Sequence, residues 1–101
     1  MILEFHPLFA ADLEEAALYY DQREPGQGLG GRFLNEADEA VASIERNPLM
    51  GGFIHRTGNI RHVLLPHFPY AIHYRVASHD LVFIVGIYHG ARDPRIWKER
   101  I

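Results

Sequence analysis

Hydrophobic residues recur along this chain with two different periods, and the change of period separates a helical part from a strand-forming part. A short apolar segment at Ile2–Phe5 predicts a first strand. Apolar side chains then recur every three or four positions from about residue 8 to residue 23, and again up to Asn47–Pro48, where the proline disfavours further helix. The glycine-rich join between these stretches is short, so we expect two antiparallel helices packed side by side.

From residue 60 onward the pattern is that of strands. Residues 60–65 are mostly apolar and include two β-branched side chains, and from Tyr70 to Val76 large apolar side chains alternate with Ala71, His73 and Arg75. A hairpin connection at 77–80 leads to residues 81–88, which are apolar on both faces and therefore predict a central strand. After this strand, Trp97 is expected to pack back from a last short turn or helix.

This order of elements predicts an α+β fold. We expect an N-terminal strand, an antiparallel helix hairpin packed on one face of a mostly antiparallel sheet, and a short C-terminal helix or turn. A chain of 101 residues suits one hydrophobic core, so residues 1–101 are interpreted as a single domain.

Composition excludes several classes of protein. Without cysteine the chain has no disulfide framework, no thiolate zinc site and no cysteine nucleophile. No histidine pair has the helical spacing of a zinc-protease motif, so no metal or other cofactor is expected. No apolar run approaches the roughly 18 residues of a membrane span, and the N-terminus lacks the basic start of a signal peptide. These features predict a cytoplasmic protein.

Charge is divided unevenly along the chain, although its formal net value is only −3 and its pI is near 6.1. Residues 1–50 hold three arginines and ten acidic residues, whereas residues 51–101 hold seven basic and three acidic residues. Six of the seven histidines also lie in the second half. The asymmetry indicates either a surface that meets an anionic partner, or acidic helices that neutralise a basic sheet.

Five basic side chains are candidates for function. His73 and Arg75 are predicted on the sheet face away from the helices, with Arg61 beside them, and His89 and Arg92 follow the central strand. An imidazole base among guanidinium groups suits phosphodiester cleavage, for which His73, His89 and Arg92 are the catalytic candidates. Arg61, Arg75 and Arg92 are candidates for binding phosphate or a target. The alternative is an ordinary solvated sheet face.

Several short segments carry a resemblance that extends in order over nearly the whole chain. They are Ala11–Ala16 followed by Tyr19–Tyr20, Arg32–Leu34 leading to Asn47–Pro48, Ile60–Arg61, Phe68–Val76, and Ile87–His89 continuing to Trp97. Together they resemble the RelE/ParE superfamily of toxins from bacterial type II toxin–antitoxin modules. The resemblance implies the same fold, a cognate antitoxin protein as partner, growth inhibition and plasmid stabilisation.

The resemblance leaves three functions open. RelE-like members cleave mRNA on the ribosome without a metal, and ParE-like members poison DNA gyrase. The chain departs from the RelE-like pattern because Pro66–His67 replaces a basic position and Trp97 lacks a hydroxyl group. A pI near 6.1 also suits ribosomal RNA poorly. We therefore expect a ParE-like gyrase poison, with a metal-independent mRNA endoribonuclease or a non-toxic antitoxin-binding remnant as alternatives.

Overall fold

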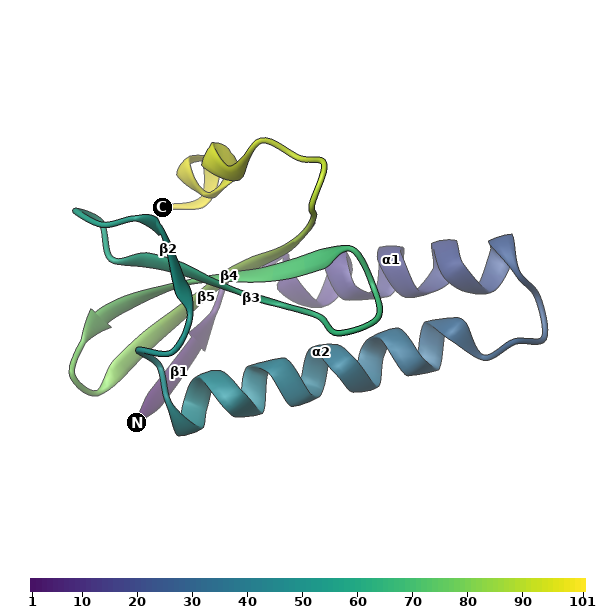
Figure 1. Cartoon of the computed structure of the whole chain (residues 1–101), viewed down its shortest axis with the longest axis horizontal. Coiled ribbons are helices and arrows are strands. Elements are labelled where there is room, and N and C mark those ends of the chain that lie inside the picture. Colours follow the sequence, from purple (N-terminus) through teal and green to yellow (C-terminus); the bar gives the residue numbers. More distant parts are fainter.

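A computed structural model describes residues 1–101 as one five-stranded sheet with two helices on one of its faces (Figure 1). The elements are β1 (Ile2–Phe5), α1 (Phe9–Arg23), α2 (Leu29–Arg46), β2 (Gly52–His55), β3 (Ile60–Leu64), β4 (Tyr70–Ser78), β5 (Leu81–His89) and the 3₁₀ helix η1 (Pro94–Arg100). The predicted N-terminal strand, helix hairpin and short C-terminal helix are confirmed. No helix of the chain has the length and hydrophobicity needed to cross a membrane.

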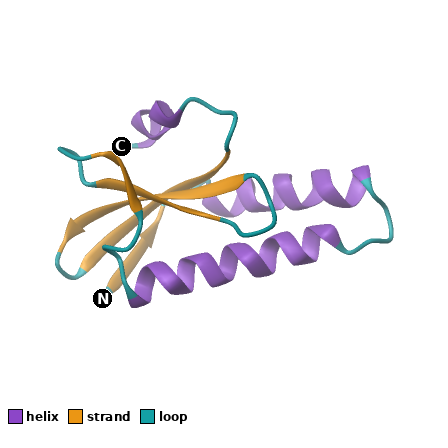
Figure 2. Cartoon of the chain, in the orientation of Figure 1, coloured by secondary structure: helices purple, strands orange, loops and turns teal.

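The strands lie in the order β1-β5-β4-β3-β2 (Figure 2). β1 pairs in parallel with β5, and all other neighbours are antiparallel, as expected for a mostly antiparallel sheet. β5 is flanked by β1 and β4, which confirms the central strand predicted from its two apolar faces. β1 stops at Phe5, opposite Ile84, so the rest of β5 has no strand beside it on that edge.

β2 was not predicted, and its sequence explains why. The strand has only four residues and starts at a glycine, so it offers neither a long apolar run nor a clear alternation. It forms because the following turn, with Asn59 at a φ of 53°, brings it beside β3. Pairing with the adjacent strand supplies what local sequence preference lacks.

The main core lies between the sheet and the helix hairpin. Phe33 and Ile44 of α2, Ile72 and Tyr74 of β4, and Ile84 of β5 have no exposed surface. The predicted apolar face of β4 is thus the face that the helices cover.

The other face of the sheet is partly covered too. η1 lies there, away from the helices (Figure 1), and places Trp97 against Ile60 and Val85 in a second, smaller cluster. The interpretation of this face as an open surface is therefore wrong for the part beneath η1. The predicted return of Trp97 onto the sheet explains the difference.

The two helices are in close contact where the second one begins. The Gly30 N–H donates to Asp21 Oδ1 of α1 at 2.8 Å, so a carboxylate of one helix caps the N-terminus of the other. A Cβ on Gly30 would lie 2.6 Å from the Ala17 carbonyl oxygen, whereas one on Gly31 would meet nothing within 4 Å.

These neighbouring glycines give a matched pair of variants. Gly30→Ala is expected to lower the free energy of unfolding by about 1–3 kcal/mol, because the Ala17 backbone must move. Gly31→Ala is expected to raise it by as much as about 1 kcal/mol, because alanine favours the helix. Urea unfolding of the two variants measures both changes. Equal effects would contradict the close helix–helix contact.

Candidate functional site

His73 lies on the predicted face of the sheet, away from the helices, but it is buried. Only 6% of the residue is exposed, and its ring packs against Tyr88 with 4.8 Å between ring centres. His62 lies directly opposite on β3. Burial, with a smaller contribution from the charge of His62, lowers the pKa of His73 from 6.5 to about 4. His73 is therefore neutral at pH 7 and shielded from any large substrate.

The structure does not bring the predicted arginines together. Arg75 is exposed on the same face as His73. The expectation that Arg61 lies beside them is wrong, because Arg61 pairs with Tyr74 and so points to the opposite face. The Arg61 Nη1 donates to the carbonyl oxygens of Leu49 and Gly51, at 2.8 and 2.9 Å. Arg61 thereby holds the loop between α2 and β2.

His89 and Arg92 do lie together, at the end of β5. The Ala91 N–H donates to His89 Nδ1 at 3.0 Å, so the neutral ring carries its proton on Nε2. This tautomer has no free lone pair with which to take a proton from a substrate. Arg92 is exposed and forms no ion pair with a carboxylate.

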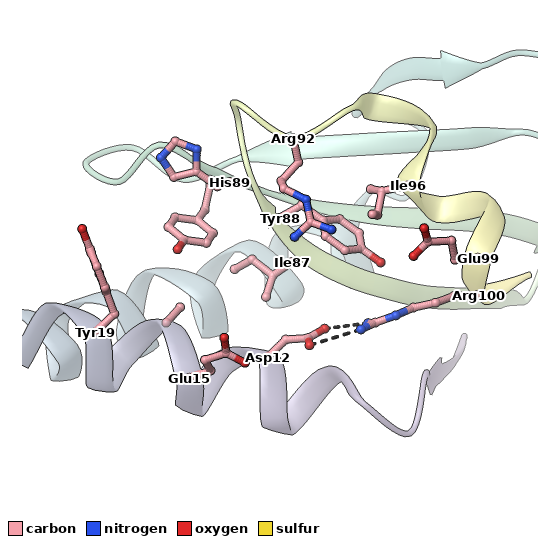
Figure 3. A pocket seen from close by; sticks show the side chains of 12 residues that line it. Asp12, Glu15, Tyr19, Ile87, Tyr88, His89, Arg92, Ile96, Glu99 and Arg100 are labelled. Atoms are coloured by element: carbon pink, nitrogen blue, oxygen red, sulfur yellow. Dashed lines mark hydrogen bonds and ion pairs between the residues drawn. The ribbon is translucent and has the colours of Figure 1, made fainter.

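A groove of about 270 Å³ runs past these two residues, between α1, the end of β5 and η1 (Figure 3). Aromatic side chains, acids of α1 and η1, and the bases of the C-terminal part line it together: Asp12, Glu15, Tyr19, Tyr70, Tyr88, His89, Arg92, Glu99 and Arg100. Its position coincides with the stretch of β5 that β1 leaves unpaired. The groove thus combines a free strand edge with aromatic and charged contacts.

An ion pair closes one end of the groove. Arg100 Nη1 donates to Asp12 Oδ2 at 2.6 Å, and Nη2 donates to Oδ1 at 3.2 Å. Arg100 Nη1 also donates to the Val85 carbonyl oxygen at 3.2 Å, and Asp12 raises the pKa of Arg100. The bidentate pair joins α1 to η1 and is largely shielded from water.

Sequence reasoning found His89 and Arg92 but missed the other lining residues. Asp12 and Arg100 are 88 positions apart, and nothing in a single sequence links them. Tyr70 lies on the apolar face of β4, as an ordinary core residue would, and Tyr19 stands out in the sequence only through the family resemblance. No group of three or more histidine, aspartate and glutamate side chains is arranged to hold a metal ion.

The chain is a small α+β protein with a groove beside the unpaired end of β5. The family model described as "ParE toxin of type II toxin-antitoxin system, parDE" matches residues 3–94. The chain therefore belongs to the ParE toxin family, and it is the toxin of a type II toxin–antitoxin system. The resemblance to the RelE/ParE superfamily, nearer its ParE-like branch, is confirmed.

A solved structure agrees with this fold. A chain from the chromosomal ParDE toxin–antitoxin system of P. aeruginosa superposes with a TM-score of 0.72. The two sequences are 21% identical, and the match covers 88% of this chain and 95% of the other. No curated protein sequence matches the chain.

The burial of His73 makes stability depend on pH. His73 of the unfolded chain binds a proton near pH 6.5, and His73 of the folded chain binds one only near pH 4. The stability that the neutral, buried ring contributes is therefore fully present above pH 6.5, and it is lost as the pH falls between these values. In metal-free buffer the free energy of unfolding is expected to fall by about 2 kcal/mol from pH 7 to pH 5 through this residue alone.

Urea unfolding of His73→Gln and His79→Gln at both pH values measures this contribution. His73→Gln is expected to remove most of the fall, whereas His79→Gln, at an exposed turn position, is expected to retain it. An unchanged pH dependence in His73→Gln would show that His73 is not the group responsible.

Proposed function

We propose that this toxin arrests growth by binding DNA gyrase, without a chemical reaction of its own, and that a cognate antitoxin blocks it. Membership of the ParE toxin family is the observation that carries the proposal. Both partners act in the cytoplasm, which is also where we expect this protein.

The arrangement of the basic residues supports binding over RNA cleavage. A general base works best with a pKa near the pH of the reaction and a free lone pair facing the substrate. His73 is buried with a pKa of about 4, and the exposed nitrogen of His89 carries a proton. Arg61 is occupied by backbone carbonyl oxygens. None of the three is positioned for a proton transfer or for phosphate binding.

The purified toxin is expected to inhibit DNA supercoiling by gyrase at micromolar concentration. His89→Ala is expected to inhibit equally well, because the proposed function uses no base. A gel assay of plasmid supercoiling with both proteins measures this, with the toxin–antitoxin complex as the inactive control. Unimpaired supercoiling by the wild-type protein, or cleaved transcripts in cells that express it, would contradict the proposal.

The groove beside β5 is proposed as the antitoxin site. Antitoxin segments can add to a sheet edge as an extra strand, where backbone hydrogen bonds give affinity and side-chain pockets give specificity. The unpaired end of β5 offers such an edge, and Tyr19 and Tyr70 line the groove beside it. Tyrosine is among the residues that most often dominate binding energy.

Tyr19→Ala is therefore expected to weaken antitoxin binding about 10- to 100-fold. Leu18→Ala is the matched control, because Leu18 is similarly exposed on α1 but does not line the groove. Isothermal titration with the antitoxin encoded beside the toxin measures both affinities. Equal affinity in the two variants would place the antitoxin elsewhere.

A further inference from the structure

The loop between α2 and β2 is fixed from beneath by a buried tyrosine. The Tyr74 hydroxyl donates to the Pro48 carbonyl oxygen at 2.7 Å and accepts from the Gly51 N–H at 3.1 Å. Tyr74 has no exposed surface, and its burial raises the pKa of the phenol. The two hydrogen bonds therefore lie in a dry interior, where losing either leaves a buried polar group without a partner.

Arg61 holds the same loop from the neighbouring strand. It donates to the carbonyl oxygens of Leu49 and Gly51, and its Nε donates to Asn59 Oδ1 at 3.2 Å. The backbone at Gly51 lies so close to this support that a Cβ there would meet the Tyr74 hydroxyl and, at 2.8 Å, the His62 carbonyl oxygen. The loop thus has little freedom to move.

This rigid backbone presents apolar side chains to solvent. Leu49 is 62% exposed, Met50 44% and Phe53, on β2, 37%. Because they are so exposed, these side chains add little to the stability of the fold. An apolar cluster on a backbone that is already ordered loses little conformational entropy when a partner binds it. We call these three residues, together with Arg46 and Arg56, the Leu49 surface.

The segment that forms the Leu49 surface carries positive charge and no negative charge. No aspartate or glutamate occurs from Arg46 to His79. The Arg56 and Arg61 guanidinium carbons lie 4.6 and 4.0 Å from the centre of the Phe53 ring. Arg46 and Arg56 form no ion pair with any carboxylate of the chain. Their charges are therefore available to a partner.

We infer that the Leu49 surface docks an apolar, acid-rimmed patch on the protein that this toxin inhibits. This rests on the proposed function, in which the toxin acts by binding. Three large apolar side chains among the cations favour a protein over a nucleic acid, whose phosphates are contacted by positive and polar groups. β2 has no strand on its outer side, so its edge can add backbone hydrogen bonds to the contact.

The Leu49 surface is separate from the proposed antitoxin groove. The groove lies where β1 stops along β5, and the Leu49 surface flanks β2 at the other edge of the sheet. The two share no residue. A substitution in one is therefore expected to leave binding at the other unchanged.

Leu49→Asp and Arg56→Glu test this inference. Each is expected to raise the toxin concentration for half-maximal gyrase inhibition at least about tenfold, because each opposes the acidic rim. The matched controls, Leu18→Asp on α1 and Arg32→Glu at an exposed position of α2, are expected to stay within about twofold of wild type. Urea unfolding checks that all four variants are folded, and titration with antitoxin is expected to give unchanged affinity.

Growth arrest on induction of each variant provides a readout that does not depend on the identity of the target. If the wild-type toxin arrests growth but leaves gyrase unimpaired, the proposed target is wrong, while loss of arrest in Leu49→Asp and Arg56→Glu still supports the surface. Full arrest by both variants would overturn the inference. A tenfold loss of antitoxin affinity in both would overturn it as well, by assigning the surface to the antitoxin.

Discussion

Ile72 and Tyr74 of β4 pack against α2 with no surface left exposed, and this contact determines how the rest of the chain is arranged. Since side chains alternate along a strand, burying these two sends His73 to the opposite face. The register of β3 against β4 then sets Arg61 opposite Tyr74, where the two polar side chains share one loop. A slip of one residue in β4 would exchange its faces and remove both the buried histidine and the support of the loop.

Much of the fold is predictable from the sequence because its largest elements bury continuous apolar surface. The periodicity of α1 and α2 identifies the helices, and the two apolar faces of β5 identify the inner strand. β2 is not predictable from the sequence for a local reason, because Gly52–His55 has little strand preference of its own. Its place is fixed by pairing with β3 and by the guanidinium of Arg61 over Phe53, both of which require the folded sheet.

The candidate site is less predictable, because its residues meet across long separations. Alternation along β4 assigns His73 to the correct face, but its burial depends on the ring of Tyr88 from another strand. Arg61 was assigned to the wrong face because alternation within one strand says nothing about the register between two. The contact between Asp12 and Arg100 joins the first helix to the last turn and leaves no trace in local sequence.

That contact between Asp12 and Arg100 also bears on the order in which the protein matures during synthesis. α1 leaves the ribosome first, and Arg100 follows 88 residues after Asp12. Until then Asp12 has no cationic partner, and η1 is not yet tied to α1. The nascent chain therefore completes its helix hairpin before it completes the groove.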